Sequence, residues 1–126
     1  MSFENVILSN LVYNEDYGRK VIPFLKTEYF SEYSDKVIYE LVDNYVKKYN
    51  SFPSVEALAI DLSNKEGLNE QVFATAKETI SGFEHDSKTK LDWLLDQTEK
   101  FCQDKALYLA IMQSIQIMDE KNGSIS

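Results

Sequence analysis

The chain has 126 residues, of which 44% are hydrophobic and 13% aromatic, so it can bury one core and is not wholly disordered. With 4 glycines and 2 prolines it has too few turn residues for a β-sandwich or barrel, which favours helices. Its net charge of -8 makes it a poor independent binder of nucleic acid or of an anionic membrane surface, and leaves protein partners as the open possibility.

Cysteine usage and the N-terminus bear on the compartment. Cys102 is the single cysteine, so an internal disulfide is excluded and a reducing cytoplasm is expected. The first residues lack the basic and apolar regions of a signal peptide. No stretch approaches the roughly 20 apolar residues needed to span a bilayer, so we expect no membrane partner.

The first two helices are predicted by their caps and by the spacing of their apolar residues. Ser2 can cap the first helix, and Asn14 can cap a shorter one that must break at Pro23. Tyr29 and Phe30, which follow the next turn, are expected to be buried anchors. The apolar positions of the first helix are Phe3, Val6, Ile7 and Leu11.

The clearest helix runs over residues 35–49. Its polar residues, Asp35 among them, are expected on the outer face. Tyr45 and Tyr49 lie at apolar positions, which favours a place in the core over a role in stacking on nucleic-acid bases. The residues expected on the buried face are Val37, Ile38, Leu41, Val42, Tyr45, Val46 and Tyr49.

Two further helices follow a loop that contains Pro53. Ser54 is the expected cap of the fourth helix and Gly67 its end, while Asn69 opens the fifth, which ends near Gly82. A polar turn over residues 84–87 comes next. The buried positions expected in these two helices are Val55, Leu58, Leu62, Val72, Phe73, Ala76, Ile80 and Phe83.

Nothing interrupts a last helix over residues 88–120. About 33 residues would span about 50 Å, more than the roughly 36 Å diameter of a compact domain of this length. The helix must therefore protrude, bend or break. The stripe expected to pack on the domain is Leu91, Leu94, Leu95, Phe101 and Cys102.

The distal half of this helix carries apolar residues on more than one face, and Ile117 is one of these residues. A helix of this kind is buried by more than its own small domain. We therefore predict a self-association surface made of Leu107, Tyr108, Leu109, Ile111, Met112, Ile115 and Met118. The expected organisation is a helical globule (1–86), a long helix of the same domain (87–121) and the start of a linker or tail (122–126).

Catalytic chemistry is nearly absent from the sequence. No Gly-rich phosphate loop is present, so we expect the chain alone neither to bind nor to hydrolyse ATP. His85 stands between two acidic residues in a polar turn, where an imidazole is usually solvated rather than a metal ligand. Cys102 is expected to be a small core residue rather than a nucleophile. No catalytic, cofactor-binding or metal-binding residue is predicted.

The order of these motifs resembles the N-terminal domain of DnaB-like replicative DNA helicases, in particular those of T-even-type bacteriophages. The resemblance extends from about Val6 to about Met118, and its specificity lies in the order and spacing of short motifs. These are Asn5 to Tyr13, Ile7-Leu8-Ser9 within it, Lys20-Val21 before Pro23, Glu28-Tyr29-Phe30, Asp35 to Tyr49, Phe52 to Leu58, and Trp93-Leu94 to Thr98-Glu99-Lys100.

The resemblance implies a place in a replication machine. The parent enzymes are ATP-driven hexameric helicases that move 5′ to 3′ and use ATP and Mg in a motor domain. Their N-terminal domains form a collar that pairs through a helical hairpin and meets primase or a helicase loader. This chain contains no Walker motif and no arginine finger, so ATPase and unwinding do not carry over to its residues. The implied location is the cytoplasm of the infected bacterial host.

Two functions of different classes follow from the sequence. One is the collar domain of a phage helicase, and the other is a free-standing helical phage adaptor or regulator that binds a protein partner. An enzyme that uses Cys102 or His85 comes third. A reading frame that continues past Ser126 into a Walker motif would favour the collar, as would a dimer or larger ring.

Overall fold

A computed structural model describes residues 2–125, with side chains described for residues 2–122. The described residues form six α-helices and one short 3₁₀ helix and contain no strand, which confirms the all-α prediction. The elements are α1 (Phe3–Tyr13), α2 (Glu15–Val21), η1 (Thr27–Tyr29), α3 (Tyr33–Tyr49), α4 (Val55–Asn64), α5 (Glu70–Ser81) and α6 (Leu91–Ile125).

The predicted caps are all present. Each capping side chain accepts a hydrogen bond from the backbone N–H three residues further on, which satisfies a donor that the first turn of a helix leaves free. Asn14 has two roles, because its backbone N–H also closes the last turn of α1 on Asn10. The four capping residues are Ser2, Asn14, Ser54 and Asn69.

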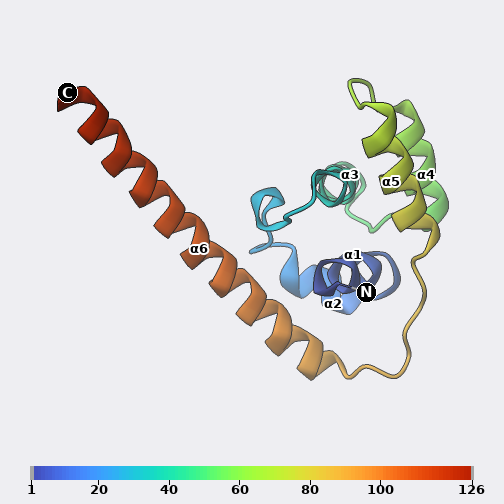
Figure 1. Cartoon of the computed structure of the whole chain (residues 1–126). Coiled ribbons are helices and arrows are strands. Elements are labelled where there is room, and N and C mark those ends of the chain that lie inside the picture. Colours follow the sequence, from blue (N-terminus) through green and yellow to red (C-terminus); the bar gives the residue numbers. More distant parts are fainter. Residues whose placement is uncertain (1, 126) are drawn as a thin grey trace.

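The helices form a globule from which α6 extends as an arm (Figure 1). Within the globule, α3 packs against α1, α4 and α5, and α4 packs against α5. The arm contacts α2 and η1 and is joined to α5 by an extended loop. The helix therefore protrudes, which is one of the three outcomes that its length allows.

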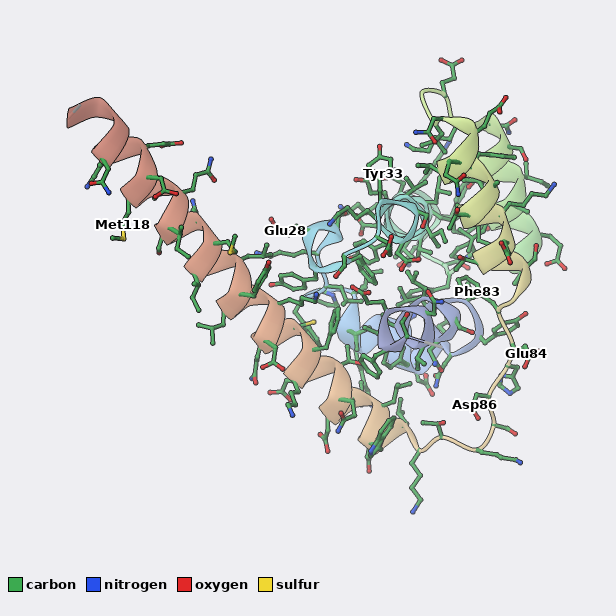
Figure 2. The ribbon with its side chains drawn as sticks, in the orientation of Figure 1. Glu28, Tyr33, Phe83, Glu84, Asp86 and Met118 are labelled. Carbon is green, nitrogen blue, oxygen red and sulfur yellow. The ribbon has the colours of Figure 1, made fainter. Side chains whose placement is uncertain are left out.

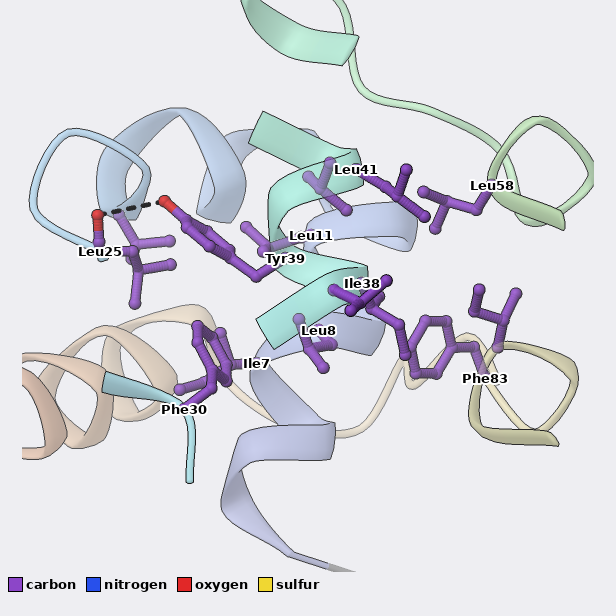
Figure 3. Packing of buried hydrophobic residues seen from close by; sticks show 14 of the residues in the cluster. Ile7, Leu8, Leu11, Leu25, Phe30, Ile38, Tyr39, Leu41, Leu58 and Phe83 are labelled. Atoms are coloured by element: carbon purple, nitrogen blue, oxygen red, sulfur yellow. Dashed lines mark hydrogen bonds between the residues drawn. The ribbon is translucent and has the colours of Figure 1, made fainter. Parts of the chain in front are cut away.

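The core lies between α1, α3 and the helices around them (Figure 3). Ile7 and Leu8 of α1 and Ile38 of α3 are fully buried, and Phe30 stacks on Tyr39 with ring centroids 5.2 Å apart. Both expected anchors after the turn, Tyr29 and Phe30, are buried. The expected core residues Val37, Leu41, Leu58, Leu62, Ala76, Ile80 and Phe83 are also buried.

The expectation for α3 is wrong at its edges. Tyr49 is 56% exposed and Tyr45 is only half-buried, whereas Tyr39 and Asp35 are buried. The difference in burial along α3 depends on a neighbouring segment and not on the helix itself. The chain segment that leads into η1 covers the first half of α3 and leaves the second half more exposed. The hydroxyl of Tyr39 donates to the carbonyl of Leu25 in that segment at 3.1 Å.

Three helix boundaries also differ from the prediction. α4 ends at Asn64, and Gly67 lies beyond it in a loop, where its φ of 86° suits a residue without a Cβ. α6 begins at Leu91 because Asp86 accepts hydrogen bonds from the N–H groups of Lys88 and Thr89, which fixes a turn there. At the other end, residues 122–125, expected to begin a linker or tail, are helical.

Candidate interaction surface on helix α6

The first half of α6 is fixed to the globule. Leu94 and Cys102 are buried, and Leu91, Leu95 and Phe101 pack against the core, as predicted. This half forms one side of the domain and gives the arm a defined direction.

A buried polar contact, which the sequence analysis missed, also holds this half of α6. Thr98 is fully buried, and its hydroxyl lies 2.8 Å from that of Tyr17 in α2 and 2.8 Å from the carbonyl of Leu94. One polar residue between Leu94 and Cys102 on an inward-facing stripe is the signal that could have revealed it.

The second half of α6 leaves large apolar side chains in solvent (Figure 2). Leu107 is 63% exposed and Met118 62%, values far above those of the core. We call the exposed row on one side of the helix the outward stripe; its members are Leu107, Tyr108, Ile111, Met112, Ile115 and Met118.

Two residues of this region do not belong to the outward stripe. Leu109 is half-buried and packs against the core of its own domain, although the sequence analysis placed it with the association residues. Ile117 is 46% exposed but falls on another side of the helix. At about 100° per residue, the outward stripe is centred about a third of a turn away from the domain-facing stripe. The centre of the outward stripe therefore differs from that of the surface that packs on the globule, although Met112, 18 residues after the buried Leu94, lies on the side of α6 that faces the globule.

A groove runs along the other flank of α6, next to α2. It has a volume of about 530 Å³, and the sequence analysis did not predict it. The signal in the sequence was an aromatic residue, Phe24, directly after the helix-breaking Pro23. In the structure its side chain is 41% exposed. The apolar lining comprises Phe24, Tyr29, Leu95, Cys102 and Ala106, and the polar lining Lys20, Glu99 and Gln103.

The structure places the two candidate catalytic residues in environments of opposite kinds. Burial raises the pKa of Cys102 to about 11, so the thiol is protonated near neutral pH and is a poor nucleophile. His85 is exposed in the loop before α6, with its ring edge-on to Tyr13 at 6.0 Å between centroids. These two residues do not come together in a site.

The described residues contain no candidate metal site and no candidate membrane span. Within residues 2–125, no cluster of three or more His, Cys, Asp and Glu side chains is arranged to hold a metal ion. In the same range, no helix has both the length and the apolar character needed to cross a membrane.

Comparison with known proteins gives one informative match. No family model matches the chain. The chain is 34% identical over 112 residues to the DnaB-like replicative helicase of Enterobacteria phage T4. The aligned region covers 89% of this chain and 23% of that helicase, so the chain spans about a quarter of the length of its relative. The match thus confirms the resemblance to a phage DnaB-like replicative helicase and fits an N-terminal domain of such an enzyme.

Proposed function

We propose that this chain is the N-terminal collar domain of a phage DnaB-like hexameric replicative helicase, where it associates with a neighbouring subunit and docks primase or a helicase loader during DNA replication. The 34% identity to the phage T4 helicase over nearly the whole chain is the observation that carries this proposal. ATP and Mg would act in the motor domain of the enzyme, and the setting would be the cytoplasm of the infected host.

The outward stripe supports self-association. Its six side chains are each at least 46% exposed and follow one another along a single helix face. Contiguous apolar patches on soluble proteins normally mark an interface, because burial of apolar surface is favourable by about 25 cal/mol per Å². A second copy of the same stripe, related by a twofold axis, would cover it.

The decisive experiment replaces both Met112 and Ile115 with Glu. The two carboxylates would lose their hydration inside the apolar contact, and the outward stripe contains no cation to pair with them. We expect the unmodified chain to sediment as a dimer or larger species at tens of micromolar and the double variant as a monomer. Circular dichroism should give the same helix content for both proteins, because neither side chain belongs to the buried core.

A matched control adds the same charge to the same region of α6. Gln113 and Gln116 are exposed and, one and two turns after Leu109, continue the side of α6 that faces the globule, outside the outward stripe, so Gln113→Glu with Gln116→Glu should leave the oligomer intact. A monomeric unmodified chain would contradict self-association through α6. Dissociation of the control variant as well would show that net charge, and not the outward stripe, controls assembly.

Docking of a replication partner is tested separately. Purified primase and helicase loader from the same phage should each be titrated onto the labelled chain, with one of them expected to bind. Binding by neither protein would remove the docking part of the proposal and leave subunit association in place.

The alternative function is a free-standing helical adaptor or regulator. The groove beside α2 favours it, because an apolar hollow with charged edges is the kind of surface that accepts a segment of another protein. An adaptor would be monomeric alone and would gain mass only with its target, which the same sedimentation measurement detects.

A further inference from the structure

The groove between α2 and α6 has an apolar floor that the chain itself does not cover. The floor includes Phe24, Leu95 and Ala106, and the groove has a volume of about 530 Å³. Phe24 is 41% exposed, although burial of its ring would be favourable. Cavities of this size are typical of sites that bury the apolar groups of a ligand. The groove therefore offers an apolar surface that a second molecule would cover.

The edge of the groove that α6 forms is acidic. Asp92, Asp96 and Glu99 are exposed and follow one another at intervals of four and three residues, so they lie within about 60° of each other around the helix. Their side of α6 adjoins the side that carries Leu95 and Ala106. Among residues 2–122, no Lys or Arg forms an ion pair with any of the three carboxylates. This edge thus carries three negative charges that the described part of the chain leaves without a paired cation.

The edge that α2 forms has the opposite charge. Lys20 lines the groove from α2 as Glu99 does from α6, and these two side chains do not form an ion pair. The groove therefore distinguishes the two flanks of a segment that enters it. Cations are favoured beside α6 and anions beside α2.

We propose that this groove binds an amphipathic helix of a protein partner, with lysine or arginine residues along one edge of its apolar face. The apolar face covers Phe24, Leu95 and Ala106, and the cations lie beside Asp92, Asp96 and Glu99. This inference rests on the docking part of the proposed function and adds to it the site and the chemistry of the partner.

A helix suits the groove better than an extended segment does. Extended peptides bind by adding a strand to the edge of a sheet, and residues 2–125 contain no strand. A helix instead presents apolar residues at i, i+3, i+4 and i+7 to a groove. From Asp92 to Ala106, α6 rises by about 21 Å, so a partner helix of about 14 residues would span both the charged edge and the floor.

Charge also favours such a partner over a second copy of the chain. The outward stripe, which a second copy would offer to the groove, lies within residues 107–118, and these contain no Lys or Arg. Its insertion would remove water from the α6 carboxylates without supplying a cation. A basic partner helix supplies the cations.

Two synthetic helical peptides of about 18 residues test the chemistry of the partner. Both have leucine at i, i+3, i+4 and i+7 along one face, and they differ only along one edge of that face, where the basic probe has lysine and the acidic probe glutamate. Each carries a fluorophore and is titrated with the unmodified chain in an anisotropy measurement. We expect the basic probe to bind at least ~10-fold more tightly. Equal affinities would overturn the proposal.

Variants of the chain test the position of the site. Asp92→Asn with Asp96→Asn and Glu99→Gln should weaken binding of the basic probe by at least ~10-fold. An equal loss in a matched control would show that the probe responds to net charge and not to the groove. That control removes three exposed carboxylates from α4, α5 and the loop between them, through Glu56→Gln, Glu66→Gln and Glu78→Gln.

Ala106→Glu separates the apolar floor from the charged edge. Ala106 is exposed, so the variant should keep the helix content of the parent in circular dichroism. The added negative charge would strengthen a purely electrostatic attraction to the basic probe. In the groove, however, the carboxylate would lie against leucine side chains, and we expect at least ~5-fold weaker binding. Unchanged or tighter binding would overturn the proposal.

Titration of the primase and the helicase loader distinguishes this inference from the proposed function. Loss of their binding to the triple variant at residues 92, 96 and 99 would support the groove as the docking site. Binding as tight as to the unmodified chain would leave docking in place and exclude the groove. If neither protein binds the unmodified chain, the docking part of the proposed function falls, while a preference for the basic probe would still support the groove as a site.

Discussion

Tyr17 is fully buried in α2, and its hydroxyl group lies 2.8 Å from that of Thr98 in α6. Burial raises the pKa of Tyr17, so the phenol stays protonated and can donate. Thr98 uses its own proton on the carbonyl of Leu94 and accepts from the tyrosine. One buried polar pair thus joins the arm to the globule at a defined position, which apolar contacts alone specify less strictly.

Tyr17→Phe should therefore lower the free energy of unfolding by about 1–2 kcal/mol, because it removes a buried hydrogen bond without changing the shape of the ring. Urea titration followed by circular dichroism measures the loss. Tyr13→Phe is the matched control, since that hydroxyl is only part-buried at a long 3.4 Å from the carbonyl of Phe83. Equal losses in the two variants would contradict a special role for the Tyr17–Thr98 contact.

Asp35 is the second buried polar residue, and its charge is unfavourable where it lies. Burial, with the nearby carboxylates of Glu4 and Glu32, raises the pKa of Asp35 to about 6. The folded state therefore holds a proton more tightly than the unfolded chain. The contribution of Asp35 to stability is largest below about pH 4, the unfolded pKa, and is lost as the pH rises through about 6.

Asp35→Asn should accordingly stabilise the protein at pH 7.5 by about 1 kcal/mol and have little effect near pH 4. The gain is limited because a negative charge in the first turn of α3 also interacts favourably with the helix dipole. Thermal unfolding of variant and parent at both pH values measures the difference. A variant that is less stable at pH 7.5 would show that the carboxylate is needed there.

At the scale of elements, the helix caps could be predicted from the sequence, whereas the packing of one element against another could not. The caps at Asn14 and Ser54 depend on a few adjacent residues, so the sequence alone indicated them. The burial of Tyr39 and the exposure of Tyr49 depend on which part of α3 the η1 segment covers. Leu109 likewise looked like an association residue because nothing in its own helix says how far the globule reaches. The other six residues of the predicted association surface are exposed, and their role in association stays a prediction. The groove at Phe24 could not be predicted from one element, because α2 and α6 form it together.

Leu41 tests the packing of α3 against its neighbours. It is 8% exposed and lies near Leu58 of α4 (Figure 3). Leu41→Ala should cost about 2–5 kcal/mol of unfolding free energy, because it leaves a cavity in a packed core. Ile60→Ala on the 61% exposed side of α4 is the control and should change stability by less than about 0.5 kcal/mol. A loss below that value for Leu41→Ala would mean that the wrong face of α3 has been assigned to the core.

The whole molecule is an acidic globule with an apolar arm. Its net charge of -8 opposes approach to a polyanion. The free energy of burying the apolar side chains of the arm does not depend on the charge of the partner. Long-range electrostatics thus disfavour nucleic acid, and short-range burial favours protein. The two properties favour protein partners over nucleic acid, which is consistent with the proposed function.

We expect the chain to bind single-stranded DNA weakly and to lose any binding seen at low salt by about 150 mM. Fluorescence anisotropy of a labelled oligonucleotide, measured over a salt series, gives the affinity. Tight binding that survives about 200 mM salt would require a basic face that overcomes the overall charge.

Because only the first half of α6 is anchored, a small tilt of that half moves the free end of the helix by a larger distance. About sixteen residues, or about 24 Å of helix, extend beyond Leu109, the last residue that packs on the globule. A tilt of about 10° at the anchored half displaces the tip sideways by about 4 Å. Small changes around Thr98 would thus be amplified along the arm, and would alter the proposed contact between subunits although the Tyr17–Thr98 hydroxyl pair lies far from it.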